Sequence, residues 1–266
     1  VKGKWIASFS RVFTLNGITK DTSVAIVAES QSRPVLIKLA ELACYQLGAD
    51  FATITLPTPE IKTPVPVRST GASDAIQHKR YVIEALKRVE IIIDLTVEGL
   101  LHAEELEEIQ SDGTRILVIC NEHPEILERC EPTAELGVKV NKGIKMLHKA
   151  STMRVTSKAG TDLTIDVKNA PCGGTPGFST RNAGVSHWPG GLCLCFPGEN
   201  TVNGTIVMQA GDMNLTFKEY LRDSITLTVK NDFVTDIAGN NLDAELFRSY
   251  IESWNDPGAY GFSHIG

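Results

Sequence analysis

The sequence predicts an α/β fold, with a mostly parallel Rossmann-like sheet and helices over residues 1–150 and a β-rich α+β domain over residues 151–266. Up to about residue 150, short β-branched runs alternate with amphipathic helical stretches, which is typical of a parallel sheet with right-handed crossovers. Beyond that point, short alternating runs and glycine-rich turns replace the helical pattern. A length of 266 residues also favours two domains.

Strands and helices of the first half follow one another in pairs. Residues 23–28 form a β-branched run typical of a strand buried on both faces, and Pro34 opens a helix that Gly48 closes as a C-cap. The same cycle predicts strands at 51–56, 91–95 and 115–120, and helices at about 74–88, at 103–110 and after Pro124. A proline-rich surface loop is expected over 56–66, and the lack of a G-x-G-x-x-G motif argues against a dinucleotide site.

The second half is predicted to be mainly strands. Alternating runs mark them at 153–157, 162–166, 192–196 and 204–209, and in a hairpin that pairs 225–229 with 233–237 through a turn at 230–232. A glycine- and proline-rich loop is expected at 171–177. One helix is expected at 243–254, with Asp243 as its N-cap.

Composition and charge exclude several classes of protein. A net charge of −6 argues against nucleic acid or an anionic membrane as the main partner. No apolar run is long enough to span a bilayer, and no secretory signal is recognisable near Val1. The six cysteines are scattered without zinc-site spacing, which favours buried structural thiols. We therefore expect a cytoplasmic protein.

The six histidines separate into two groups by their sequence context. His78 and His148 lie on charged helical stretches, which predicts solvated side chains, and His123 precedes Pro124 at a helix start, which favours a local structural role. The other three, His102, His187 and His264, are the candidates for chemistry.

Each candidate histidine has both a functional and a structural interpretation. His102 follows the strand at 91–95, at the sheet edge where open α/β folds bind ligands, and acidic neighbours suit a general base; a surface histidine at a helix start fits equally well. His187 lies on a glycine-flanked loop in Ser-His-Trp-Pro, where it serves either a site or packing. His264, among aromatics and glycines, fits a buried metal ligand or a core histidine.

Motifs across the whole chain resemble the 2,5-dihydroxypyridine 5,6-dioxygenases of nicotinic acid breakdown, whose superfamily includes thermophilic-type metalloaminopeptidases. The matching segments, in order, are 100–102, 113–117, 155–160, 186–189, 204–208, 230–237, 254–257 and 260–266. The resemblance implies a non-haem Fe(II) enzyme that opens a dihydroxypyridine or similar hydroxylated N-heteroaromatic ring with O₂, giving an N-formylmaleamate-type product. It also implies a homo-oligomer.

The resemblance assigns roles to the three candidate histidines. His264 matches the first iron ligand, His102 matches the residue that moves the substrate proton, and His187 matches a residue that lines the site. The family's other two ligands form a downstream His-x-Asp pair, which these 266 residues lack, so we expect them beyond residue 266. Thr175 stands where the dihydroxypyridine enzymes carry a glutamate, which indicates a changed substrate.

Two other functions stay open at this point. One is a metal-dependent, aminopeptidase-like hydrolase, which Thr175 disfavours because threonine supplies no carboxylate to a two-metal site. The other is a non-catalytic relative without metal. We further expect His102, His187 and His264 to converge on one cleft between the two domains.

Overall fold

The structure is a computed structural model that describes residues 1–60, 71–217 and 219–266. The described chain divides into two units. The first comprises residues 1–60, 71–140 and 175–192, and the second comprises residues 141–174 and 193–266. Each unit is described by itself below.

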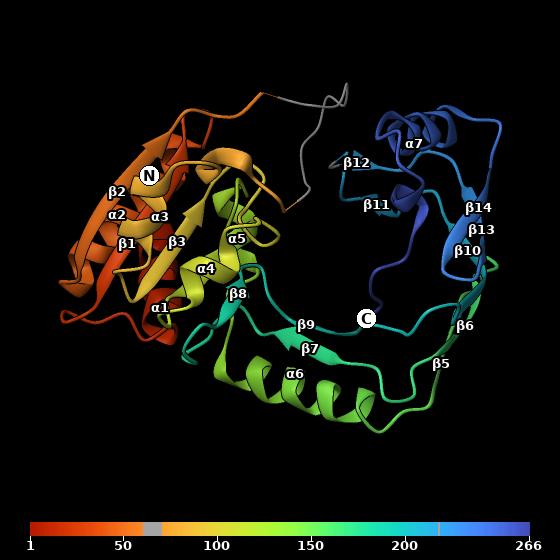
Figure 1. Ribbon diagram of the computed structural model, residues 1–266, viewed down its shortest axis with the longest axis horizontal. Coiled ribbons are helices and arrows are strands. Elements are labelled where there is room, and N and C mark those ends of the chain that lie inside the picture. The colour runs from red at the N-terminus through yellow and green to blue at the C-terminus, as the bar shows by residue number, and fades with distance from the viewer. Residues whose placement is uncertain (61–70, 218) are drawn as a thin grey trace. The chain divides into compact units, whose positions relative to one another are not determined.

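A five-stranded sheet with all neighbours parallel forms the centre of the first unit (Figure 1). Its strands, in spatial order, are β2 (Asp50–Leu56), β1 (Ser23–Glu29), β3 (Ile91–Leu95), β4 (Arg115–Val118) and β8 (Val185–His187). From β1 the chain runs outward to β2 and then returns to β3 on the other side of β1. The strand order therefore reverses between β1 and β3, and this is where open α/β sheets bind ligands. The predicted parallel, Rossmann-like sheet is confirmed.

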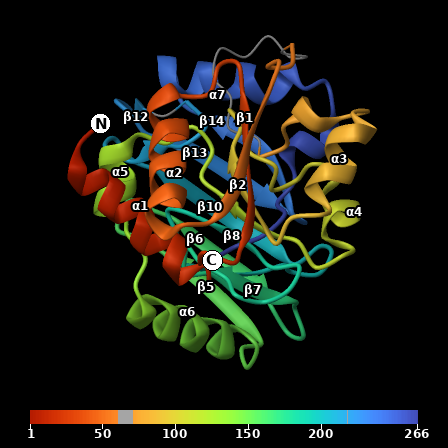
Figure 2. The same cartoon turned by 90° about the vertical axis from the view of Figure 1, so that its left-hand side faces the viewer.

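Helices cover both faces of this sheet (Figure 2). One face packs against α1 (Gly3–Leu15), α2 (Pro34–Leu47) and α5 (Pro124–Arg129). The other packs against the 3₁₀ turn η1 (Asp74–Ile76), α3 (Arg80–Leu86) and α4 (Leu106–Gln110). Because side chains alternate along a strand, Ile93 faces the first group and Ile92 the second. All five residues of β3 are buried, as a doubly covered strand requires.

The predicted elements of the first half are confirmed at some boundaries and corrected at others. Gly48 ends α2 with a φ of 71°, a left-handed conformation that glycine adopts without strain. The helix predicted over 74–88 is instead split into η1 and α3, with His78 between them at a φ of 62°. The acidic helix begins at Leu106 and not at 103, and β4 ends at Val118 because Cys120 has a φ of 54°. The loop predicted over 56–66 lies outside the described residues from 61 onward.

The second unit is built on a five-stranded antiparallel sheet. Its strands, in spatial order, are β14 (Phe233–Ala238), β13 (Ile225–Lys230), β10 (Val202–Met208), β6 (Asp162–Asp166) and β5 (Thr152–Thr156). Two short pairs accompany it: β7 (Cys172–Thr175) with β9 (Leu192–Cys195), and β11 (Met213–Asn214) with β12 (Glu219–Tyr220). The helix α7 (Leu242–Ser253) packs on the β13–β14 end and leads to the 3₁₀ turn η2 (Pro257–Tyr260). This confirms the predicted β-rich unit.

The predicted turn at 230–232 is confirmed in the second unit, whereas the predicted N-cap of its last helix is corrected. Asn231 and Asp232 both have positive φ, 48° and 71°, as a two-residue type I′ turn between β13 and β14 requires. The helix cap is Asn241 and not Asp243: the Asn241 side chain accepts a hydrogen bond from the Ala244 N–H at 2.9 Å. Asp243 is buried and instead accepts from the backbone N–H groups of Arg222 and Asp223, in the loop before β13.

The compact units differ from a division of the chain at residue 150. The helix α6 (Ala134–Leu147) contains the first crossing between the units, after Val140. Residues 175–192 then return to the first unit, because Val185, Ser186 and His187 pair in parallel with β4. The segment predicted as a loop at 171–177 contains the short strand β7.

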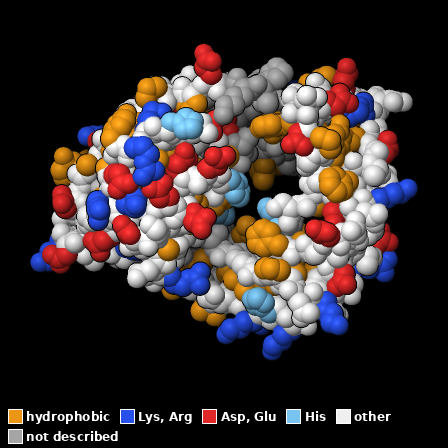
Figure 3. Space-filling model, viewed as in Figure 1, with side chains coloured by type: hydrophobic (Ala, Val, Ile, Leu, Met, Phe, Trp, Pro, Cys, Tyr) orange, Lys and Arg blue, Asp and Glu red, His pale blue; other side chains and the backbone are white. Residues whose placement is uncertain are grey.

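The surface and thiols agree with the composition. No helix among the described residues is long and apolar enough to cross a membrane. On the face seen in Figure 3, acidic and basic side chains are interspersed. Ion pairs on the surface include Arg11–Glu131 and Arg154–Asp162. No disulfide joins the six cysteines, all of which lie in the described residues. Burial raises the pKa of the Cys44 thiol to about 12, so this thiol stays protonated.

Candidate functional site

The carboxyl edge of the parallel sheet carries two of the three candidate histidines. His102 lies in the loop between β3 and α4, and His187 is the last residue of β8. The strands β3 and β8 flank β4, with Asp94 and His187 both in register with Val118. The structure therefore brings His102 and His187 to the same end of one sheet, where open α/β folds bind ligands.

His102 is held against the backbone of Gly71. Its N–H donates to the Gly71 carbonyl at 2.6 Å. Gly71 has a φ of 72°, and a Cβ at this position would come within 3.1 Å of Cδ2 of the imidazole. A glycine is therefore needed both for the turn and for the room that the ring occupies.

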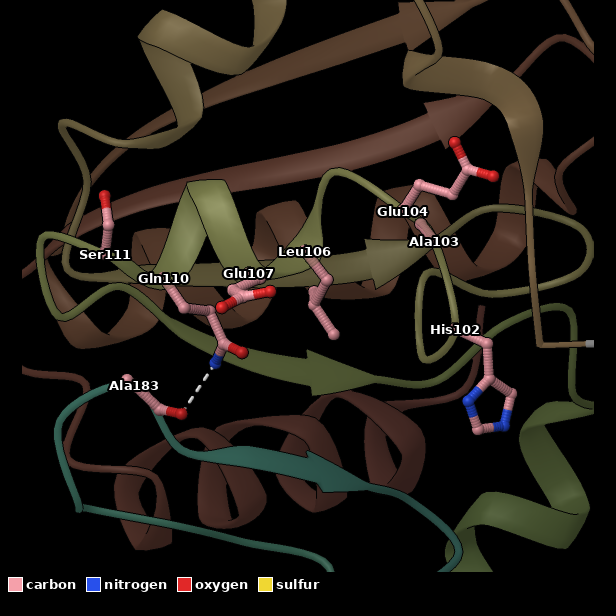
Figure 4. A pocket seen from close by; sticks show the side chains of 8 residues that line it. All are labelled: His102, Ala103, Glu104, Leu106, Glu107, Gln110, Ser111 and Ala183. Atoms are coloured by element: carbon pink, nitrogen blue, oxygen red, sulfur yellow. Dashed lines mark hydrogen bonds between the residues drawn. The ribbon is translucent and has the colours of Figure 1, made fainter. Parts of the chain in front are cut away.

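The exposed His102 lines an open cavity of about 620 Å³ that runs along α4 (Figure 4). Gln110 closes its far end by donating from Nε2 to the Ala183 carbonyl at 2.7 Å, which ties α4 to the segment before β8. In Figure 4 the imidazole and the Glu104 carboxylate point in opposite directions. Within the described chain no ion pair joins His102 to Glu104, so the ring is presented without that acidic partner.

His187 ends a strand, which corrects its prediction as a loop residue. Its Nδ1 lies 2.6 Å from the Pro189 carbonyl oxygen. Because a carbonyl only accepts, Nδ1 carries the proton, and in the neutral imidazole Nε2 then has the lone pair. The half-buried ring thus offers one acceptor nitrogen of defined tautomer at the sheet edge.

Trp188 shows why the neighbouring positions differ in role. Strand alternation turns Trp188 to the opposite face from His187, where it is 1% exposed and packs on the Phe9 ring at 4.9 Å between centroids. Its Nε1 donates to the carbonyls of Leu127 and Cys130 at 3.1 and 3.0 Å. The packing and hydrogen bonds of Trp188 therefore explain its presence in the core. His187 lies on the other face and is a candidate for the site.

His264 belongs to the second unit and is exposed, which corrects the expectation of a buried histidine. The adjacent Ile265 forms two backbone hydrogen bonds with Cys195, at 2.9 and 3.0 Å, and these fix the segment. The ring lies 5.8 Å from the Phe196 ring. Its imidazole is accessible to a ligand, and its convergence with His102 and His187 stays a prediction.

A metal site is not complete in the described chain. Over residues 1–60, 71–217 and 219–266, no three His, Cys, Asp or Glu side chains form a group that could hold a metal ion. His264 offers one imidazole, whereas a two-histidine-one-carboxylate site needs three protein ligands. The described residues alone therefore do not fit the iron site that the resemblance implies.

Thr175 has a local structural role at the end of β7. Its hydroxyl accepts from the Gly177 N–H at 3.1 Å, and its carbonyl accepts from the Gly191 N–H at 2.8 Å. The side chain is 7% exposed. The threonine side chain therefore closes its own turn.

The remaining histidines behave as predicted. His78 and His148 are exposed. His123 caps α5, because its Nδ1 accepts from the Glu125 N–H at 3.2 Å.

Two buried carboxylates at the sheet edge were not predicted. Asp94, in β3, is 0% exposed, and burial raises the pKa of its carboxyl to about 6. Glu29, at the end of β1, is 2% exposed, and its Oε1 accepts from the Ser73 hydroxyl at 2.6 Å. The signal in the sequence was the single charge inside the apolar run Ile-Ile-Ile-Asp-Leu.

Comparisons with known proteins identify the family that the chain resembles. The family model for 2,5-dihydroxypyridine 5,6-dioxygenase matches residues 4–266. The chain is 33% identical over 260 residues to a 2,5-dihydroxypyridine 5,6-dioxygenase of Pseudomonas putida KT2440, covering 97% of this chain and 73% of the relative. The structure of 2,5-dihydroxypyridine dioxygenase from that organism matches with a TM-score of 0.88 at 31% identity, covering 98% of this chain and 74% of that one. AmpT from Thermus thermophilus shares the fold, with a TM-score of 0.54 at 14% identity, covering 97% of this chain and 77% of that one.

Proposed function

The chain belongs to the 2,5-dihydroxypyridine 5,6-dioxygenase family, and we propose that it opens the ring of a dihydroxypyridine or a similar hydroxylated N-heteroaromatic. O₂ is the second substrate, Fe(II) the cofactor and an N-formylmaleamate-type compound the product. The observation that carries the proposal is the placement of His102 and His187 at the carboxyl edge of one parallel sheet, in a chain matched along its length by this family.

His102 takes the proton of a ring hydroxyl in this proposal. Removing that proton makes the ring electron-rich, and an electron-rich ring reacts with O₂ more readily. The imidazole lines an open cavity, so a small aromatic ring can approach it. In the overall reaction one ring bond breaks, and both oxygen atoms of O₂ enter the product, so no other oxidant is needed.

His187 binds the substrate in this proposal. When Nδ1–H donates to the Pro189 carbonyl, Nε2 of the neutral imidazole is an acceptor, which suits a hydroxyl or ring N–H of the substrate. The hydrogen bond to Pro189 fixes the orientation of the imidazole, so His187 can bind the substrate without exchanging a proton with it. Binding and proton removal are thereby divided between two histidines.

Fe(II) would bring O₂ and the substrate together at its open coordination positions. We assign His264 as one of its ligands. This assignment rests on the family match at residues 260–266 and on the accessible imidazole. A homo-oligomer and a cytoplasmic location stay predictions from the sequence.

Oxygen uptake tests the proposal. The protein, supplied with Fe(II) under anaerobic conditions, is mixed with O₂ and 2,5-dihydroxypyridine, and separately with catechol as a control that lacks the ring nitrogen. We expect one O₂ consumed per dihydroxypyridine ring lost. Release of an amino acid from an aminoacyl amide, without O₂ uptake on any dihydroxypyridine, would instead identify a hydrolase.

A further inference from the structure

Asp94 is a carboxylate inside the core of the first unit. It is 0% exposed and lies in β3 between Ile93 and Leu95, which are also fully buried. A charge in such a place costs free energy unless hydrogen bonds satisfy both of its oxygens. The partners of Asp94 therefore indicate what the residue does.

The Asp94 side chain accepts hydrogen bonds from the loop that leads to His102. Oδ1 accepts from the backbone N–H and the hydroxyl of Thr96, at 2.9 and 2.6 Å. Oδ2 accepts from the Leu100 N–H at 2.6 Å. These hydrogen bonds come from two residues four positions apart, so they fold the loop around the carboxylate. An ionised carboxylate suits this role because both of its oxygens are strong acceptors.

The hydrogen bonds continue to His102. The Thr96 hydroxyl also accepts from the Gly99 N–H at 3.1 Å, and the Leu100 carbonyl accepts from the Ala103 N–H at 3.1 Å. His102 therefore lies within a turn whose first residue, Leu100, is bonded directly to Asp94. A shift of Leu100 would move the imidazole.

A second buried carboxylate holds the segment against which His102 rests. Ser73 donates from its hydroxyl to Glu29 at 2.6 Å and from its N–H to the Gly99 carbonyl at 2.8 Å. Two residues before Ser73, the Gly71 carbonyl accepts from the His102 N–H. The loop is thus held on one side by Asp94 and on the other through Ser73 and Glu29.

We propose that Asp94 is a positioning residue for His102: its carboxylate fixes the loop Thr96–Leu100 so that the imidazole lies where it can take the substrate proton. This inference rests on the proposed function for its consequence in turnover, but not for the positioning itself. Asp94 does not touch substrate in this account. A purely structural role would stabilise the fold and leave the imidazole's surroundings unchanged.

Replacement of Asp94 by asparagine tests this with little change in volume. An amide has one acceptor oxygen, so Asp94→Asn cannot satisfy Thr96 and Leu100 together. We expect kcat for ring opening to fall by ~10²-fold with little change in KM, the order expected when a reacting group is displaced by about 1 Å. Asp112→Asn, the same change at an exposed aspartate of the first unit, is the matched control.

A second pair of variants keeps the test independent of the folding of Asp94→Asn. Thr96→Val removes the hydroxyl that bonds Asp94 and Gly99, and Thr96→Ser keeps it. We expect Thr96→Val to lower kcat as Asp94→Asn does, and Thr96→Ser to restore most of it. In a His102→Ala background, neither Asp94→Asn nor Thr96→Val is expected to lower kcat further, because the group they position is gone.

NMR of the protein carrying ¹³C-labelled histidine separates this inference from the proposed function. The His102 ring signal, assigned by its loss in His102→Gln, is expected to shift or broaden in Asp94→Asn and Thr96→Val, while the exposed His148 signal stays in place. An unmoved His102 signal, or an equal loss of kcat with and without His102, overturns the positioning role. A moved signal with unchanged kcat supports the positioning and overturns the proposed proton transfer by His102.

Discussion

Asp94 and His187 lie in one row of the parallel sheet, because each is the register partner of Val118. Two strand spacings, about 10 Å, separate their backbones, and side chains in one row point to the same face. A buried carboxylate and a half-buried imidazole are thus presented from strands on either side of β4. The loop that Asp94 holds carries His102 to the same edge, so three polar side chains define the site of the first unit.

Replacing His102 with alanine is expected to leave bound iron in place and to slow ring opening by ~10²–10⁴-fold, the usual contribution of a positioned proton-transfer group. The loss shrinks as pH rises toward the pKa of the substrate hydroxyl, because solution then supplies the anion. Steady-state rates between pH 6 and 10, with metal content measured on the same samples, check this. His148→Ala is the control, and a His102 variant with full activity at neutral pH removes the role.

Replacing His264 with alanine is expected to abolish both iron binding and turnover, because a ligand of the metal is lost. Ser263→Ala, next to it, keeps the imidazole and is expected to retain both. Iron is measured by elemental analysis after anaerobic loading and gel filtration. Stoichiometric iron in His264→Ala would require another ligand set.

Asp94 makes stability depend on pH in a defined direction. Its pKa rises from an ordinary 3.8 to about 6 on folding, chiefly through desolvation by burial. The folded state therefore binds the proton more tightly, so this contribution is fully present below about pH 4 and is lost as pH rises through about 6. Over that window the free energy of unfolding falls by about 3 kcal/mol from this group.

Urea denaturation of wild type and Asp94→Asn at pH 4, 5, 6 and 7 measures that contribution. The difference in unfolding free energy between the two proteins is expected to change across the window in favour of the variant, since asparagine does not titrate. A difference that stays constant from pH 4 to 7 contradicts the burial argument.

Trp188→Phe is expected to destabilise the first unit by about 1–3 kcal/mol, because two carbonyls, of Leu127 and Cys130, lose the N–H they share. Thermal or urea unfolding measures the change. Trp254→Phe, at a residue 37% exposed, is the control and is expected to have a much smaller effect. Equal destabilisation by the two changes would show that the shared N–H contributes little.

Local signals predicted much of the fold. Pro34 and Gly48 mark the two ends of α2, and the buried strands of the parallel sheet are visible as β-branched runs. The turn at Asn231 and Asp232 is equally local, since both residue types tolerate positive φ.

Pairing between strands far apart in the sequence could not be predicted from such local signals. The strand β8 is three residues long and flanked by glycines, so only its contact with β4 makes it a strand and returns residues 175–192 to the first unit. The sequence context of His187 therefore does not show that it is the register partner of Val118 in the sheet. The role of Asp94 was missed because a buried carboxylate is recognisable only when the loop that satisfies it is known.

The central claim is that the protein opens a dihydroxypyridine ring with both atoms of O₂. Mass spectrometry of the product formed under ¹⁸O₂, by protein expressed from its complete gene and loaded with Fe(II), tests it most directly. The account predicts an acyclic product that carries two ¹⁸O atoms, formed far more slowly by His102→Ala. A product with no ¹⁸O from O₂, or an intact ring after O₂ exposure, would contradict it.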